Sequence, residues 1–234
     1  MRNLQRFFLA CLGLSTSCVI WSETDQKRGP LDRLQKGNVR FLEKASPIVL
    51  KKEEAFSPFA VIVTSSDPSV TPELIFDQQP GDLFVVRTAG GIICKSQMDT
   101  VRYGAMHYTP SLIVVLGNGD CGAVRAVMEG NTKNIPAIAK KILPAIERLR
   151  KEGKDLTLKA VIEENALQVQ REIEADPTIR KKIEQKELSV RSAYYEPQTG
   201  KVHFLPAPSY KKGEDSSTRK GQKKGVVSAT LPED

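Results

Sequence analysis

Apolar positions along residues 31–205 follow two patterns. Runs of consecutive apolar and β-branched residues, which are typical of buried strands, occur at 59–64, 82–87 and 111–116. Around these runs, apolar residues recur at helical spacing, which predicts helices at 31–42, 100–108, 121–129, 135–151 and 158–175 and a short helix after 177. Strands that alternate with helices in this way predict an α/β fold, with helices flanking a central and mostly parallel sheet.

Two further apolar segments near the C-terminus predict a β-hairpin. The segments at 190–195 and 201–205 flank Glu196-Pro-Gln-Thr-Gly200, which is typical of a turn. The hairpin would add an antiparallel edge to the sheet. Residues 209–234 are rich in Lys, Gly, Ser, Glu and Asp, and such a composition cannot build a core. We therefore expect a disordered basic tail at 209–234.

The first 22 residues have the pattern of an export signal. Arg2 and Arg6 precede an apolar stretch at 7–20 that is shorter than a membrane span, and Ser22 provides a small residue for cleavage. We expect a signal peptide at 1–22, a linker at 23–30 and a periplasmic or secreted protein with no membrane span after signal removal. Lipoprotein anchoring at Cys18 and an uncleaved anchor helix are the alternatives.

Length and charge limit the organisation and the classes of partner. The chain has 234 residues and a net charge of +7, which suits one sizeable domain, expected at 31–208. Many of its basic residues lie in helices that are also rich in Glu, or in the tail, and no basic stripe alternates with aromatic residues. We therefore expect solvated basic faces and no nucleic-acid partner.

Polar residues gather in three turns that follow the predicted strands, at 65–69, 88–91 and 117–122. In parallel sheets, ligands bind where the carboxyl ends of strands meet the starts of helices. The third turn also spells G-x-G-x-x-G, from Gly117 to Gly122, so nucleotide binding is one hypothesis. Against it, the pattern follows the third strand, and no strand that ends in Asp or Glu lies about twenty residues further on.

Several separated segments resemble the β-type carbonic anhydrases. The longest is Gly81-Asp-Leu-Phe-Val-Val-Arg-Thr-Ala-Gly-Gly91, and others lie at 72–77, 114–117, 121–124, 163–165, 193–195 and 199–200. They occur in the order and spacing of that family over roughly residues 31–205. The resemblance implies the fold of the family, a homodimer or higher homo-oligomer with the site at the subunit boundary, and a catalytic zinc that converts CO2 and water to bicarbonate and a proton.

The resemblance also places the site residues of the family on this chain. The first zinc cysteine aligns with Ser65, the zinc histidine aligns with Asn118, and the second zinc cysteine survives as Cys121. The catalytic aspartate survives as Asp67, whereas the arginine that pairs with it aligns with Ser69.

Two neighbouring positions depart from the family as well. An asparagine after Ala-Gly aligns with Gly91, and a glutamate on the following helix aligns with Arg102. The departures from the family therefore lie at positions that align with its site residues, while the segments that carry the resemblance are kept.

The replaced residues are poor zinc ligands. Catalytic zinc takes three protein ligands from thiolate, imidazole and carboxylate, and it lowers the pKa of its bound water from about 15.7 to about 7. The alcohol of Ser65 resists deprotonation, and the neutral amide of Asn118 suits hard cations better. We therefore expect zinc to be absent or weakly bound, with CO2 hydration impaired.

Other residues offer alternative interpretations of the site. Cys94 or Asp120 can supply a ligand, and one hypothesis is a rearranged site built from Cys94, Cys121 and Asp67. A single disulfide between Cys94 and Cys121 requires the fold to bring them close. The two histidines, His107 and His203, are expected to be surface or packing residues.

Two site residues also have purely structural interpretations. Asp67 suits an Asx turn or the cap of a helix near 72. Cys121 suits a small buried thiol at a helix N-terminus, and the same position can make a thiol reactive.

Three functions follow as hypotheses. The first is an exported carbonic-anhydrase-family protein with lost or weak CO2 hydration, kept to bind a partner or to bind bicarbonate or another anion through turn amides. The second is a functional carbonic anhydrase with an altered zinc site. The third is nucleotide binding through the turn from Gly117 to Gly122.

Overall fold

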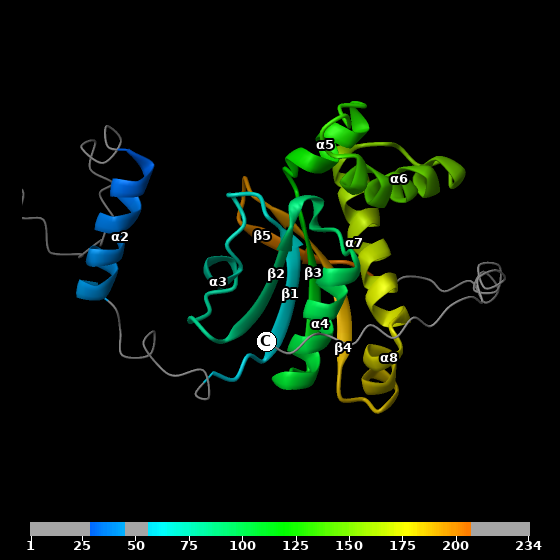
Figure 1. Cartoon of the computed structure of the whole chain (residues 1–234). Coiled ribbons are helices and arrows are strands. Elements are labelled where there is room, and N and C mark those ends of the chain that lie inside the picture. Colours follow the sequence, from blue (N-terminus) through cyan, green and yellow to red (C-terminus); the bar gives the residue numbers. More distant parts are fainter. Residues whose placement is uncertain (1–28, 45–55, 207–234) are drawn as a thin grey trace, which may run out of the picture. The chain divides into compact units, whose positions relative to one another are not determined.

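The protein is described here from a computed structural model, which describes residues 29–44 and 56–206 (Figure 1). These residues fall into two compact parts, one within Met1–Lys51 and the other within Lys52–Asp234. The first part contains helix α2, Pro30–Lys44, at the predicted place. The expected signal peptide and the tail at 209–234 lie outside the described residues, and the domain boundaries at 31 and 208 stay predictions.

The second part is built on a five-stranded sheet with the order β2-β1-β3-β4-β5. Its first four strands are mutually parallel, and the last is antiparallel to its neighbour. The strands are β1 Ala60–Ser65, β2 Leu83–Thr88, β3 Leu112–Asn118, β4 Ser189–Glu196 and β5 Lys201–Phe204. The predicted α/β fold with an antiparallel edge hairpin is therefore confirmed.

Six α-helices and one short 3-10 turn connect the described strands (Figure 1). They are α3 Pro72–Ile75, the turn η3 Ala89–Gly91, α4 Lys95–His107, α5 Gly122–Met128, α6 Pro136–Lys151, α7 Leu158–Ala175 and α8 Pro177–Glu184. No helix in the described part of the chain is long and apolar enough to cross a membrane.

Helix α4 begins five residues before the predicted start at 100. The backbone N–H of Cys94 donates to the side chain of Gln97, so a capping box starts the helix in a polar stretch that apolar periodicity does not reveal. Helix α3 lies near 72, where the sequence analysis mentioned a helix only as one that Asp67 could cap, because its four residues are too few to show a periodic pattern.

The sheet is buried on both faces. Val61, Val63 and Val115 share one apolar cluster with residues of α4, α7 and α8. Ile62 and Leu116 point to the other face, where the segment that leads into α3 contributes Val70. Each such side chain stabilises the fold by about 1.5–3 kcal/mol when it leaves water, which is why these strands carry almost no polar residues.

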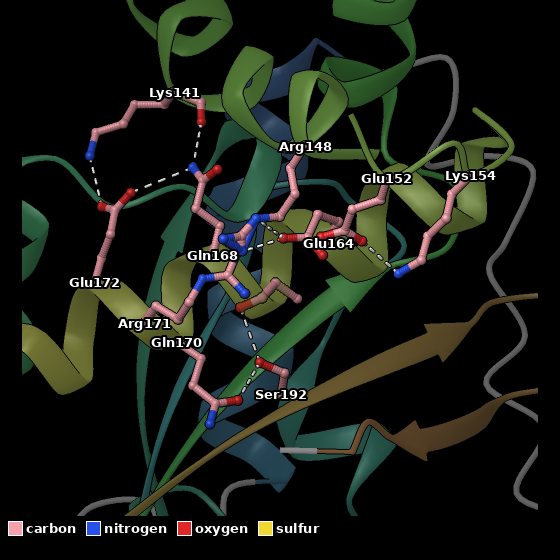
Figure 2. Close-up of polar contacts among 11 residues, drawn as sticks. Lys141, Arg148, Glu152, Lys154, Glu164, Gln168, Gln170, Arg171, Glu172 and Ser192 are labelled. Carbon is pink, nitrogen blue, oxygen red and sulfur yellow. Dashed lines mark hydrogen bonds and ion pairs between the residues drawn. The ribbon is translucent and has the colours of Figure 1, made fainter. Parts of the chain in front are cut away.

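A group of polar contacts holds helix α7 against helix α6 (Figure 2). Arg148 of α6 and Arg171 of α7 both contact the carboxylate of Glu164, whose side chain is only 9% exposed. Further along, Lys141 of α6 forms an ion pair with Glu172 of α7 at 2.8 Å. These contacts matter for function because α7 carries side chains to the carboxyl edge of the sheet.

Candidate functional site

Three buried side chains come together at the carboxyl edge of the sheet. Ser65 ends β1, Asn118 ends the neighbouring strand β3, and Cys121 is the N-cap of α5. Their residues are 3%, 2% and 3% exposed, and all three line the same small cavity. The structure therefore brings together the three positions at which the sequence analysis placed the zinc ligands of the family.

These three side chains bond to each other and to the turns around them. The oxygen of Ser65 lies 3.7 Å from the sulfur of Cys121, and either atom can be the donor. The amide nitrogen of Asn118 donates to the Ser69 hydroxyl at 3.4 Å, and its amide oxygen accepts from the backbone N–H of Asp120 at 3.3 Å. The polar atoms are thus oriented by the protein itself.

Asp67 is held by its own turn. Its Oδ1 accepts from the backbone N–H of Ser69 at 3.1 Å and from the Ser69 hydroxyl at 2.7 Å, which is an Asx turn. These bonds, with the Ser69 hydroxyl first, hold the pKa of Asp67 below its usual value against the opposing effect of partial burial. Asp67 does not cap α3, because Thr71 is the N-cap of that helix.

Arg87 is a site residue to which the sequence analysis gave no role. Its Nε donates to the carbonyl of Ser65 at 3.1 Å, and its Nη2 donates to the carbonyl of Asp67 at 2.8 Å. The guanidinium therefore fixes the backbone of the first turn, and its charge also lowers the pKa of Asp67. Arg87 is a charged residue at the end of an apolar strand, and this feature of the sequence could have pointed to it.

Asn165 of α7 is a second such residue. It is 4% exposed, it lines the same cavity, and its Nδ2 donates to the carbonyl of Gly90 at 2.9 Å. The sequence analysis noted Asn165 only as part of a family match at 163–165. Its partner Gly90 lies 75 positions away, so only the fold reveals the contact.

Comparisons with known proteins agree with this fold and this order of motifs. The sequence model of the family described as carbonic anhydrase matches residues 60–202, more than half of the chain. The chain belongs to the β-carbonic anhydrase family. It is 38% identical over 106 residues to a carbonic anhydrase of Mycolicibacterium smegmatis, a match that covers 43% of this chain and 52% of that protein. The chain thus spans about half the length of the relatives that it matches in this way.

Solved structures of the family share the fold. The β-carbonic anhydrase CcaA has a TM-score of 0.67 and 23% identity, and the match covers 77% of this chain and 100% of that one. Two β-carbonic anhydrases of the ascomycete Sordaria macrospora, described as tetrameric, give a TM-score of 0.62 at 17% identity, covering 77% of this chain and 96% of that one.

The residues at the ligand positions do not fit the zinc that β-carbonic anhydrases use. Cys121 is the one thiol there, and Ser65 and Asn118 add an alcohol and an amide whose atoms are hydrogen-bonded to neighbours. Tetrahedral catalytic zinc needs three thiolate, imidazole or carboxylate ligands. Among the described residues, no group of three or more His, Cys, Asp and Glu side chains can hold a metal ion.

The rearranged site is therefore not assembled by the residues that the structure describes. Cys94 is the N-cap of α4 and packs against the apolar cluster of α5, α6 and α7, and both body cysteines are free thiols. Asp120 is exposed and forms an ion pair with Arg125. His107 stacks on Tyr103 with ring centroids 5.0 Å apart, far along α4 from its start at Lys95.

Arg102, which the sequence analysis counted among the departures near the site, belongs elsewhere. Its guanidinium pairs with Asp176 at 3.0 Å and with Asp99 at 2.8 Å. Asp176 in turn caps α8 by accepting from Thr178 and Ile179. The arginine thus supports the contact of α4 with α8, and its presence says nothing about the chemistry.

Gly91 departs from the family at a backbone position that asparagine can also adopt. Its φ is 61°, in the left-handed region that glycine adopts freely and that asparagine tolerates better than most residues. An exchange of asparagine for glycine at this position therefore preserves the turn.

Close packing explains two of the three glycines of the third turn, Gly117 and Gly119. A Cβ at Gly117 would lie 2.8 Å from a methyl group of Ile162, and a Cβ at Gly119 would lie 2.6 Å from the carbonyl oxygen of Tyr195. The N–H of Gly119 already donates to that carbonyl at 2.8 Å. Gly122 alone of the three faces open space. The spacing that suggested a nucleotide site therefore serves close contacts within the protein.

Proposed function

We propose that this β-carbonic anhydrase family protein has lost all or nearly all zinc-dependent CO2 hydration and serves as an exported binding protein. The observation that carries the proposal is the set of Ser65, Asn118 and Cys121 at the ligand positions, bonded within the protein. A zinc ion there would have one thiolate, and it would have to break the hydrogen bonds of the amide.

The loss extends beyond the metal ligands. Asp67 has a hydroxyl and two backbone N–H groups as partners in place of a paired arginine side chain. The nearby Arg87 bonds to backbone carbonyls rather than to this carboxylate. A bidentate guanidinium contact is both stronger and more directional than a hydroxyl contact, so Asp67 loses the support that an orienting residue needs.

A protein partner is favoured over an anion held by turn amides. The backbone N–H groups of Ser69, Gly119 and Asp120 already donate to acceptors inside the protein. An anion at this edge would have to displace those contacts, whereas a partner surface would not. The tetramers described for the Sordaria macrospora relatives support a homodimer or higher homo-oligomer of this chain. Export to the periplasm or the outside rests on the signal pattern at 1–22.

Stopped-flow CO2 hydration by the purified mature protein tests the proposal. The expected rate does not exceed that of buffer alone, and Cys121→Ala leaves it unchanged. Hydration above the buffer rate that is abolished by Cys121→Ala would establish a functional enzyme with an altered zinc site instead.

A further inference from the structure

A small cavity at the carboxyl edge of the sheet has room for about one water molecule. Ser65, Asn118 and Cys121 line it from the turns, and Asn165 lines it from α7. Its volume is about 10 Å³. Such a volume is about the minimum that a protein cavity needs to hold a single water.

Asn165 lines this cavity and carries an acceptor without a partner. Within the described residues, its Oδ1 is the one buried side-chain nitrogen or oxygen that makes no hydrogen bond. The orientation of the amide is fixed, because exchanging its oxygen and nitrogen would place two acceptors, Oδ1 and the carbonyl of Gly90, against each other. A molecule that donates a hydrogen bond to this oxygen would therefore be stabilised in the cavity.

The pair of Ser65 and Cys121 presents the complementary group. The two side chains carry one hydroxyl hydrogen and one thiol hydrogen, and the single contact between them at 3.7 Å uses one of the two. The other hydrogen is free for an acceptor in the cavity. The amide of Asn118 already donates one hydrogen to Ser69 and accepts from the backbone N–H of Asp120.

The lining also selects against charge. It contains no carboxylate, guanidinium or ammonium group, and its remaining residues are glycine or aliphatic. A cation would meet no compensating charge, and an anion would face the oxygen of Asn165. Transfer of an unpaired charge into such a site is strongly unfavourable, whereas a small neutral molecule that donates and accepts is not.

We infer that this cavity is a binding site for one small neutral hydrogen-bond donor, water in the purified protein. The water donates to Asn165 Oδ1 and accepts from the Ser65–Cys121 pair. The inference rests on the proposed function, because a zinc ion bound to Cys121 would occupy the same space. The space between Ser65, Asn118 and Cys121 is thus a water site, and Asn165 of α7 contacts the water in it.

A high-resolution crystal structure, with data collected on both sides of the zinc absorption edge, separates the possible outcomes. We expect a density peak within hydrogen-bond distance of Asn165 Oδ1 with no anomalous signal. A peak with zinc anomalous signal, within coordination distance of Cys121 Sγ, would overturn both the water site and the proposed function. An empty cavity would overturn the water site alone and leave the proposed function standing.

Counting long-lived internal waters by oxygen-17 relaxation dispersion tests the same site in solution. Asn165→Leu matches the shape of the side chain without an acceptor, so one long-lived water should be lost, while Asn131→Leu on the surface should lose none. An unchanged count in Asn165→Leu contradicts the inference. If that variant does not fold, Ser65→Ala serves instead, and the loss of one long-lived water is again the supporting result and an unchanged count the contradicting one.

Discussion

At the scale of single residues, the site is reorganised around Ser69. Its hydroxyl contacts both the carboxylate of Asp67 and the amide of Asn118, so one small side chain links the first turn to the third. The resemblance to the family places an arginine at this position, and the neutral hydroxyl of Ser69 can hold the geometry of the turn but supplies no positive charge.

Removing that hydroxyl should raise the pKa of Asp67. The hydrogen bond from the Ser69 side chain has the largest effect among those that lower this pKa. The Asp67 carboxyl should therefore titrate at higher pH in the Ser69→Ala variant than in the wild-type protein. Carbon-13 NMR titration of the Asp67 carboxyl measures the shift. Ser66→Ala, an exposed neighbour, is the control and should leave the titration unchanged.

The stability of the Ser69→Ala variant should also depend less on pH than the stability of the wild-type protein does. A carboxyl whose folded pKa is depressed adds stability that is present above its unfolded pKa and is lost as the pH falls through the folded pKa. Denaturant unfolding at several pH values should therefore show that the wild-type protein has a higher free energy of unfolding than Ser69→Ala, and that this difference narrows below pH about 4. A difference that stays constant across this range would refute a role for the ionised Asp67.

At the scale of secondary-structure elements, the pattern of apolar residues predicted the strands and helices that form around that pattern. The strands and the long helix α7 follow from runs of apolar residues and helical spacing, and α7 was predicted with the bounds that it has. The start of α4 was missed because it depends on a side-chain cap at Cys94 rather than on apolar residues.

Residues whose polar partners lie far along the chain could not be assigned a role from the sequence. Arg87 acts on carbonyls about twenty positions earlier, and Arg102 acts on a carboxylate 74 positions later. The resemblance to the family predicted the grouping of Ser65, Asn118 and Cys121, whereas periodicity alone placed them only in turns at strand ends. Distant polar pairs follow from the register of the sheet, which the sequence does not show.

The third turn provides a matched pair of substitutions for the packing interpretation of its glycines. Gly119→Ala should cost about 1–3 kcal/mol of unfolding free energy, because its Cβ would overlap a backbone carbonyl that cannot move away. Gly122→Ala, which faces open space, should stay within about 0.5 kcal/mol of wild type. Equal and small effects in urea unfolding would contradict the packing interpretation.

The contact between α6 and α7 gives a second element-scale prediction. Glu164→Gln removes the charge on which Arg148 and Arg171 converge in a poorly exposed place, and it should cost about 1–3 kcal/mol. The adjacent Glu163→Gln is the control, since its ion pair with Lys159 is long at 3.9 Å and more exposed, and it should cost about 0.5 kcal/mol or less. Urea unfolding measures both.

At the scale of the whole molecule, the fold of the β-carbonic anhydrases is present, while several residues at its carboxyl edge differ from those that the resemblance to the family implies. The sheet, its order and the turns that meet at its carboxyl edge are all present. Ser65, Ser69 and Asn118, which differ from the residues of the family, lie on turns that still meet at this edge. A domain kept for its shape and its assembly surfaces fits this combination better than an enzyme with one altered ligand.

An intact scaffold should accept the lost ligands back. Ser65→Cys combined with Asn118→His supplies two thiolates and an imidazole at the three clustered positions, which is a zinc-binding set. The double variant should bind one zinc per chain, and adding Cys121→Ala to it should weaken that binding strongly. A double variant that folds but binds no zinc would show that the turns have lost the geometry of the family.

The most direct measurement for the central claim is a zinc titration of the wild-type mature protein beside this double variant, followed by calorimetry. The account predicts no stoichiometric binding by wild type and one tightly bound zinc per chain in the double variant. Stoichiometric zinc in the wild-type protein, held as tightly as in the double variant, would contradict the claim.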